Sequence, residues 1–369
     1  MGLDTIFDAS RWAAVPFHFW SLVLFTFGCM VGSFLNVCIH RMPRGESIVS
    51  PPSHCPKCRY SIPWYLNVPL VTWLMLRGRC RNCGAGISPR YFLVELLTGV
   101  AFLSCWLAFG PRSPVLALIY CLVLAGFIVA TFIDFEHYII PDEITLGGIA
   151  LGFVCSFLVP ALHQVKTSAP ALEQCFKGIV VGAGLIYGIL RLGKLLYGRQ
   201  RLALEPSTRI IFTETAVKLP DKEIPYEELF YRNSDRVVLQ ARTVEMIDRC
   251  YANAAIQLSP TTLRIDEDVY KPEDVLHLEV VTDEIVMPRE AMGLGDVKFM
   301  AAIGSFLGWQ AVVFSLMLSA IIGATVGVVL IALRKGEWSS KLPYGPYIAL
   351  AATIWIFWGL QITGWWLSW

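Results

Sequence analysis

The chain has 369 residues, of which 55% are hydrophobic and 16% are charged, and its mean hydropathy is +0.56. This composition excludes an ordinary soluble protein and indicates an all-α polytopic membrane protein, with its charged residues gathered into one or two water-facing insertions. The formal net charge of +1 excludes a bulk electrostatic partner such as nucleic acid.

The first apolar run extends from Phe17 to Ile39 and can cross a membrane, since a spanning helix needs about 20 residues. The residues before it carry Asp4 and Asp8 and lack the basic n-region of a cleaved signal peptide. A basic stretch, His40 to Arg44, follows the run. These features predict that residues 1–39 hold a permanent first transmembrane helix whose N-terminus lies outside.

Residues 40–91 are polar and rich in Arg and Lys, which predicts a cytoplasmic loop domain. This loop contains two C-x-x-C pairs, Cys55 with Cys58 and Cys80 with Cys83, at a spacing close to that of four-thiolate zinc sites. A disulfide framework is the alternative, but cytoplasmic thiols are kept reduced. Four protein thiolates leave no open ligand position, so we predict a structural zinc site rather than a catalytic one.

An apolar segment from Trp64 to Leu76 lies between the two cysteine pairs. Pro69 interrupts it, and the segment is too short to span a membrane. We expect it either to lie on the membrane surface or to pack within the metal-bound lobe. The sequence leaves both alternatives open.

Four more apolar runs occur in residues 92–197. They predict spans at residues 92–109, 115–133, 144–162 and 176–197. Asp134 closes the second of these runs, and counting spans from an outside start places it at the cytoplasmic edge of its helix. The alternative for Asp134 is a solvated loop acid. The Pro141-Asp142 pair is predicted to break the helix and to cap the next span.

The composition changes sharply across residues 198–291, where acids and bases occur throughout and no spanning run is present. Segments Arg236–Ile247 and His277–Val286 mix β-branched and charged residues in partial alternation, which predicts strands. A length of roughly 90 residues suffices for a modest independent core. We therefore predict a small soluble cytoplasmic domain, β-rich or α+β, with an accessory role, because its sequence carries no pattern for metal, phosphate or nucleophilic chemistry.

Residues 292–369 open with Gly293-Leu-Gly-Asp296, and we predict three further spans at residues 296–308, 311–333 and 347–366. The loop before the last span carries Arg334, Lys335 and Lys341, which places it in the cytoplasm. Eight spans put both chain ends outside, and every strongly basic short loop then falls inside.

In this topology Asp134 and Asp296 lie on the same side of the membrane at similar depth. A carboxylate at the mouth of a span is costly and indicates a functional site, although an N-capping role at the next helix is the alternative for Asp296. Two carboxylates held close together share a proton, so that one acts as an acid while the other activates water. We therefore expect aspartic-protease chemistry at the membrane edge, with the pair titrating as a unit.

The sequence resembles the bacterial type IV prepilin peptidases, a family of GxGD-type aspartic peptidases, over nearly the whole chain except residues 198–290. The matching segments are Gly32–Asn36, His54–Cys58, Arg77–Cys83, Arg90–Glu95, Asp134 with Pro141-Asp142 and Thr145, and Gly293–Lys298.

The resemblance implies that Asp134 and Asp296 are the catalytic pair and that the four loop cysteines bind zinc. It also implies cleavage of the basic leader of type IV prepilins and type II secretion pseudopilins, after a Gly, at the cytoplasmic face of a bacterial inner membrane. N-methylation of the new N-terminus with S-adenosylmethionine would follow. The insertion at residues 198–291 departs from the compact family pattern.

Two other classes of protein stay open from the sequence. One is a non-cleaving membrane assembly factor for pilins, which only the intact aspartates disfavour. The other is a zinc-bound transporter or channel. A transporter would need polar residues at mid-span positions, and the predicted spans carry few.

Overall fold

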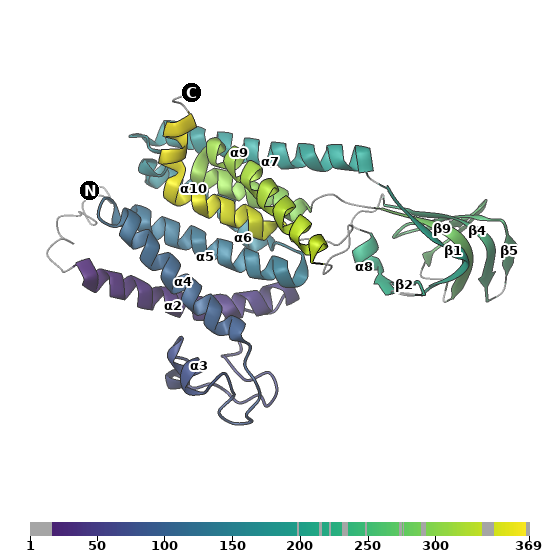
Figure 1. The fold of residues 1–369 in the computed structure, drawn as a ribbon, viewed down its shortest axis with the longest axis horizontal. Coiled ribbons are helices and arrows are strands. Elements are labelled where there is room, and N and C mark those ends of the chain that lie inside the picture. The colour runs from purple at the N-terminus through teal and green to yellow at the C-terminus, as the bar shows by residue number, and fades with distance from the viewer. Residues whose placement is uncertain are drawn as a thin grey trace. The chain divides into compact units, whose positions relative to one another are not determined.

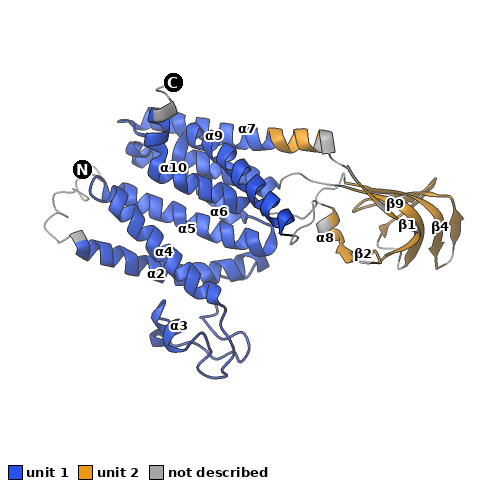
Figure 2. Ribbon diagram, in the orientation of Figure 1, with its two compact units in different colours: residues 1–187, 293–369 blue, residues 188–292 orange. Residues whose placement is uncertain are grey.

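The computed structural model divides the chain into two compact units, residues 1–187 with 293–369, and residues 188–292 (Figure 2). The predictions made on Asp4, Asp8, Arg334, Lys335 and Lys341 lie outside the described residues. The structure describes residues 17–197, 199–213, 216–220, 223–230, 235–247, 249–272, 275, 277–288, 293–333 and 343–366.

The first unit is built from helices (Figure 1). The long ones are α2 (Phe17–Arg41), α4 (Pro89–Phe109), α5 (Pro114–His137), α6 (Asp142–Leu158), α7 (Ser168–Tyr197), α9 (Leu294–Ala332) and α10 (Gly345–Trp366). Two of them begin with the same device, a serine cap followed by proline. Ser88 accepts the N–H of Arg90, and Ser113 accepts the N–H of Leu116. These caps satisfy N–H groups that the first helical turn leaves without partners.

Among the described residues, six helices are long and apolar enough to cross a membrane: α2, α4, α5, α7, α9 and α10. Helix α6 is also apolar but has 17 residues. Helix α9 has 39 residues and is broken at Gly308, whose φ of 80° and ψ of 175° are not helical. The break falls at the end of the predicted span at residues 296–308, before the predicted span at residues 311–333. The count of eight spans stays a prediction.

The helices of the first unit pack in a connected bundle. Helix α4 packs against α2 and α5, and α9 packs against α6 and α10. Helices α7 and α9 come into backbone contact at Gly178 and Gly304, because a Cβ added at Gly178 would lie 2.0 Å from the Gly304 carbonyl oxygen. Small residues allow this approach, which dispersion forces then stabilise.

The second unit contains the end of α7, from Gly188, and an antiparallel sheet with one short helix, α8 (Tyr226–Leu229). The order of its strands is β3-β2-β1-β9-β4-β6-β7-β8, with β5 also paired to β4. The strands are β1 (Arg199–Phe212), β2 (Ala216–Lys218), β3 (Glu223–Pro225), β4 (Val237–Met246), β5 (Cys250–Ala252), β6 (Ala255–Leu258), β7 (Leu263–Ile265), β8 (Asp268–Tyr270) and β9 (Leu278–Pro288). The strands predicted at residues 236–247 and 277–286 are therefore confirmed, as β4 and β9.

Alternation of buried and exposed residues gives this sheet its core. In β4, Val237, Leu239 and Ala241 are buried, and the phase then shifts at an irregularity in the pairing with β9, so that Val244 is buried next. Side chains on alternate positions of a strand point to the same face. The core formed by β1, β4, β6, β7 and β9 is largely apolar, although Thr282 of β9 is buried as well.

Candidate active site and metal centre

Asp134 lies in the last turn of α5, and its side chain is buried. The helix ends at Tyr138, whose φ of 55° turns the chain away and whose N–H donates to the Asp134 carbonyl. The carboxylate itself accepts a hydrogen bond from the N–H of Gly345, at 2.8 Å from Oδ2. Gly345 is the first residue of α10, so the carboxylate faces the N-terminus of a helix, where N–H groups favour negative charge. Asp134 is therefore not a solvated loop acid.

Asp296 lies in the first turn of α9 and is also buried. Its Oδ2 accepts the N–H of Gly293 at 3.2 Å, and Gly293 is the N-cap residue of the helix. The side chain thus reaches back to the residue before the helix, as the third residue of a capping box does. Asp296 is not itself the N-cap residue, so that alternative is wrong in position, although its side chain does stabilise the helix start.

Asp134 and Asp296 are brought toward each other around Ile140. Ile140 packs beside both of them: a Cβ added at Gly345 would lie 2.8 Å from Asp134 Oδ2 and 3.1 Å from Ile140 Cδ1, and a Cβ added at Gly295 would lie 3.4 Å from Ile140 Cβ. The C-terminus of α5 and the N-termini of α9 and α10 therefore converge here, with little room for larger side chains at Gly345.

Tyr344 precedes Gly345 and belongs to the same site. Its phenol oxygen lies 3.0 Å from Ser319 Oγ, which fixes the ring against the second half of α9. Burial raises the pKa of Tyr344, and the nearby charge of Asp296 also raises it, although the Ser319 hydrogen bond acts in the other direction. Tyr344 and Gly345 are not among the site residues predicted from the sequence. Their only signal is a Tyr-Gly-Pro turn directly before an apolar run.

Two ion pairs surround the aspartates. Lys298 in the first turns of α9 lies 2.6 Å from Asp142 at the start of α6, and Arg90 of α4 pairs with Glu136 of α5. The expectation that Asp142 caps α6 is wrong, because the N-cap residue is Pro141 and no side-chain cap is formed. Asp142 instead joins the ends of α6 and α9, since its carboxylate points to the Lys298 ammonium group rather than back to its own backbone.

The four loop cysteines form a compact cluster, with all four sulfur atoms within 4.8 Å of one another. Cys55 Sγ lies 3.9 Å from Cys83 Sγ, and Cys58 Sγ lies 3.9 Å from Cys80 Sγ. Zn–S bonds of about 2.3 Å in a tetrahedron place sulfurs about 3.8 Å apart, so the cluster fits zinc. A disulfide would need about 2.05 Å, and all four cysteines are free.

Both halves of the cluster share one backbone design. The N–H of Arg59 donates to the Cys55 carbonyl, and the N–H of Gly84 donates to the Cys80 carbonyl, each at 2.9 Å. Arg59 and Gly84 follow the second cysteine of their pairs, and both have positive φ, 56° and 69°. Each pair therefore forms a knuckle that turns both sulfurs to one side.

The knuckles also favour thiolates. The backbone N–H of Tyr60 and the Asn82 amide lower the pKa of Cys58 to about 6. The backbone N–H groups of Cys83 and Asn82 lower the pKa of Cys80 as well. The N–H of Ala85 lowers the pKa of Cys83, but the Cys58 sulfur, burial and the other sulfurs outweigh it and raise the value to about 11. Four thiolates at this spacing repel one another unless a cation lies between them.

Comparison with known proteins identifies the family of the chain. The sequence model of the Type IV leader peptidase family matches residues 118–203 and 274–328, which include both aspartates. The model of the Bacterial Peptidase A24 N-terminal domain matches residues 26–109, which include the four cysteines. Residues 204–273 of the strand unit lie in neither match. No solved structure was found to match the chain.

Relatives of the chain carry consistent names. A prepilin leader peptidase/N-methyltransferase of Aeromonas hydrophila is 29% identical over 383 residues, covering 96% of each chain. One of Myxococcus xanthus is 45% identical over 149 residues, 39% of this chain and 44% of that protein. A type 4 prepilin-like proteins leader peptide-processing enzyme of Escherichia coli is 34% identical over 195 residues, 48% of this chain and 69% of that protein. The chain belongs to the type IV leader peptidase family.

Proposed function

We propose that the chain is a membrane aspartic endopeptidase that removes the basic leader peptide of type IV prepilins and type II secretion pseudopilins. One observation carries the proposal: two buried carboxylates, Asp134 and Asp296, lie where the ends of three helices converge, in a member of the type IV leader peptidase family. The names of the relatives from Aeromonas and Myxococcus support prepilins as the substrate.

In the proposed reaction, one carboxylate takes a proton from a water molecule while the other, protonated, donates its proton to the carbonyl oxygen of the scissile peptide. The water oxygen attacks the carbonyl carbon, and a tetrahedral diol forms. The C–N bond then breaks. The leaving nitrogen takes the proton that came from water, and the second carboxylate takes back a proton from a diol hydroxyl. Both carboxyl groups return to their starting protonation.

Each aspartate accepts a backbone N–H through one of its two carboxylate oxygens. Gly345 and Gly293 each donate to the Oδ2 atom of one aspartate. These bonds hold the carboxylates in fixed positions before substrate arrives, which lowers the cost of reaching the transition state. We assign the two Oδ1 atoms to water and substrate.

The proposed topology has eight spans and places the N-terminus outside and the aspartates at the cytoplasmic face of the bacterial inner membrane. It adds α6 and both halves of α9, divided at Gly308, to the other five apolar helices. The basic residues of the cysteine loop, residues 40–91, support its cytoplasmic placement. Residues 92–197 and 292–369 then carry the other seven spans, and residues 198–291 form an accessory domain.

We also propose that Cys55, Cys58, Cys80 and Cys83 hold a structural zinc ion. Zinc would tie the two knuckles together and supply the positive charge that four thiolates require. The relatives' names include N-methyltransferase, so we propose that the enzyme also methylates the new N-terminal amine. S-adenosylmethionine would supply the methyl group.

The proposal is tested with purified protein in proteoliposomes mixed with a prepilin. Mass spectrometry of the product should show loss of the leader, and added S-adenosylmethionine should raise the product mass by one methyl group. Prepilin that binds but keeps its leader would favour the non-cleaving assembly factor. Neither binding nor cleavage, in protein shown to be folded, would overturn both and reopen the transporter class.

A further inference from the structure

The cysteine lobe carries an apolar segment that the fold of the lobe does not cover. This segment, residues 64–75, comprises the single turn Trp64–Leu66, the linker 67–70 and helix α3 (Val71–Met75). Trp64 is 84% exposed and Met75 is 77% exposed. Tyr65, Val68, Val71 and Leu74 are exposed as well. Packing within the metal-bound lobe, one of the two expectations from the sequence, is therefore wrong for these side chains.

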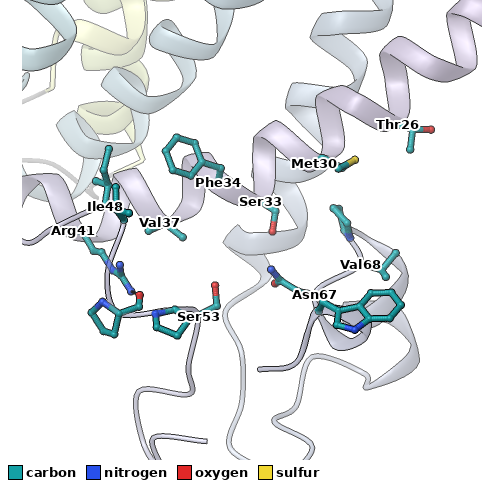
Figure 3. A pocket seen from close by; sticks show the side chains of 15 residues that line it. Thr26, Met30, Ser33, Phe34, Val37, Arg41, Ile48, Ser53, Asn67 and Val68 are labelled. Carbon is teal, nitrogen blue, oxygen red and sulfur yellow. Dashed lines mark hydrogen bonds between the residues drawn. The ribbon is translucent and has the colours of Figure 1, made fainter. Parts of the chain in front are cut away.

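The exposed segment lies beside the lipid-facing side of α2. A pocket of about 510 Å³ lies between them. It is lined by Thr26, Met30 and Phe34 of α2, by Trp64, Asn67 and Val68 of the segment, and also by Arg41 and the loop at residues 48–53 (Figure 3). Phe27, Met30 and Phe34 are exposed on α2, as expected of a spanning helix that faces lipid. The apolar surface of the segment is thus continuous with a surface that the bilayer covers.

The position along α2 gives the depth of the segment. Met30 precedes Arg41, at the basic end of α2, by eleven residues, which corresponds to about 16 Å of helix. One leaflet contributes about half of a hydrocarbon core of about 30 Å. Side chains that lie beside Met30, such as Val68, are therefore at the depth of acyl chains and not in water (Figure 3).

Part of the backbone of the segment is satisfied by hydrogen bonds within the chain. An unsatisfied N–H in a bilayer costs several kcal/mol, on the order of the values for transfer to hydrocarbon. Pro63 and Pro69 carry no N–H. The N–H groups of Leu66, Asn67, Val71, Thr72, Leu74 and Leu76 all donate to nearby carbonyls of the chain.

The backbone N–H of Leu70 has its partner in a neighbouring helix. It is the central residue of a strained turn, with φ of 61°, in which the N–H of Val71 donates to the Pro69 carbonyl. Its own N–H donates to Glu95, a buried carboxylate of α4, at 2.7 Å. Trp73 packs on Phe92 of α4, with ring centroids 5.2 Å apart. The segment is thus anchored to α4 while its other side chains stay exposed.

We propose that residues 64–75 insert into the leaflet next to the Arg41 end of α2, and that acyl chains fill the pocket between the segment and α2. Under the proposed topology this is the cytoplasmic leaflet. The cysteine lobe is then held against the bilayer by its own chain, on the face where the leader peptide is cut.

The test uses the full chain in nanodiscs of phosphatidylethanolamine and phosphatidylglycerol, with a photocrosslinking amino acid at Trp64 or Met75. Phe27 on α2 is the lipid-facing control, and Lys57, exposed in the first knuckle, is the water-facing control. We expect lipid adducts from Trp64 and Met75 at a yield comparable to Phe27 and several-fold above Lys57. Yields equal to Lys57, or adducts with a second protein chain, would overturn the proposal.

A second measurement needs no substitution. A phospholipid with a photoreactive group in its acyl chain should label the peptide containing residues 64–75 in the unmodified chain, as it labels α2. Labelling confined to the spanning helices would overturn the insertion. Neither experiment depends on peptidase activity, so failure here is distinguishable from failure of the proposed reaction.

Discussion

The helical unit and the strand unit differ in the carboxylates that they bury. The strand unit has a largely apolar core, buries a single carboxylate among its described residues, Asp235, and keeps its described ion pairs, such as Arg242 with Asp283, at the surface. The helical unit buries Asp134, Asp296 and Glu95, and each of them accepts a backbone N–H. Burying a carboxylate is costly, so a fold retains it where it performs a task. Two buried carboxylates at converging helix ends, an arrangement that the described part of the strand unit does not contain, assign the chemistry to the helical unit.

The largest effect on cleavage is expected from substitution of the two aspartates. Asp134→Asn and Asp296→Asn should each reduce prepilin cleavage on the order of 10²-fold to 10⁴-fold, because each removes a group that exchanges a proton in the transition state. Membrane abundance should stay unchanged, since an amide keeps the shape of the side chain. Asp142→Asn is the control, because it removes an exposed carboxylate from an ion pair. Near wild-type cleavage by either dyad variant would exclude that residue from catalysis.

The next largest effect on cleavage is expected from substitution of Gly345. Gly345→Ala adds a Cβ that would lie 2.8 Å from Asp134 Oδ2, so the carboxylate or α10 must move. A displacement of about 1 Å at a reacting group can cost on the order of 10²-fold in rate, and we expect a loss of cleavage approaching that size. Gly147→Ala in α6 is the matched control, because nothing lies within 4 Å of its added Cβ. Equal rates for the two variants would show that Gly345 does not position Asp134.

Substitutions in the cysteine lobe test whether peptide cleavage at the aspartates depends on the proposed zinc site. Cys58→Ser or Cys80→Ser should lower zinc from about one ion per chain, because a four-ligand site loses a thiolate. We expect methylation to fall more than cleavage, since the proposed peptide chemistry needs no metal. Cys250→Ser, an exposed cysteine of β5, is the control. The measurements are metal content and product mass; protein purified reduced and without chelators that contains no zinc would contradict the site.

Deletion of the strand unit should have a smaller effect on cleavage. Its first and last strands pair along their length, with Arg201 opposite Val286 and Leu202 opposite Ile285. Paired strands lie about 4.8 Å apart, so a Gly/Ser linker of about a dozen residues can replace residues 201–284. We expect processing of a simple model prepilin to survive, with a possible change in substrate choice measured on several prepilins. Complete loss at wild-type abundance would show that the strand unit helps to build or gate the active site.

The smallest expected effect is on local stability of the strand unit and comes from substitution of Asp283. The N–H of Ser207 and the Arg242 guanidinium lower the pKa of this carboxyl in the folded chain. Its contribution to stability is therefore present above the unfolded pKa of about 3.9 and is lost as pH falls through the lower folded value. Asp283→Asn should increase hydrogen exchange in β9 slightly at neutral pH. The difference from wild type should vanish in acid; a difference that grows as pH falls would contradict this assignment.

Much of the fold can be predicted from local sequence patterns. Apolar runs of sufficient length predict helices because an apolar helix is the stable state of such a run in a bilayer. The two C-x-x-C pairs predict a clustered site because each knuckle is formed by neighbouring residues. The strands β4 and β9 follow from alternation, which places one face of each strand in the core.

Contacts between distant segments are decided only by the tertiary structure. The sequence by itself determined that Asp134 and Asp296 stand at ends of apolar runs, but not that Gly345 donates to one of them. It indicated an apolar segment at residues 64–76, but not that Glu95 satisfies the N–H of Leu70. Both contacts join residues whose separation along the chain carries no periodic signal. They exist because packed helices bring a donor and an acceptor together where water is excluded, and an unpaired polar group there would be too costly.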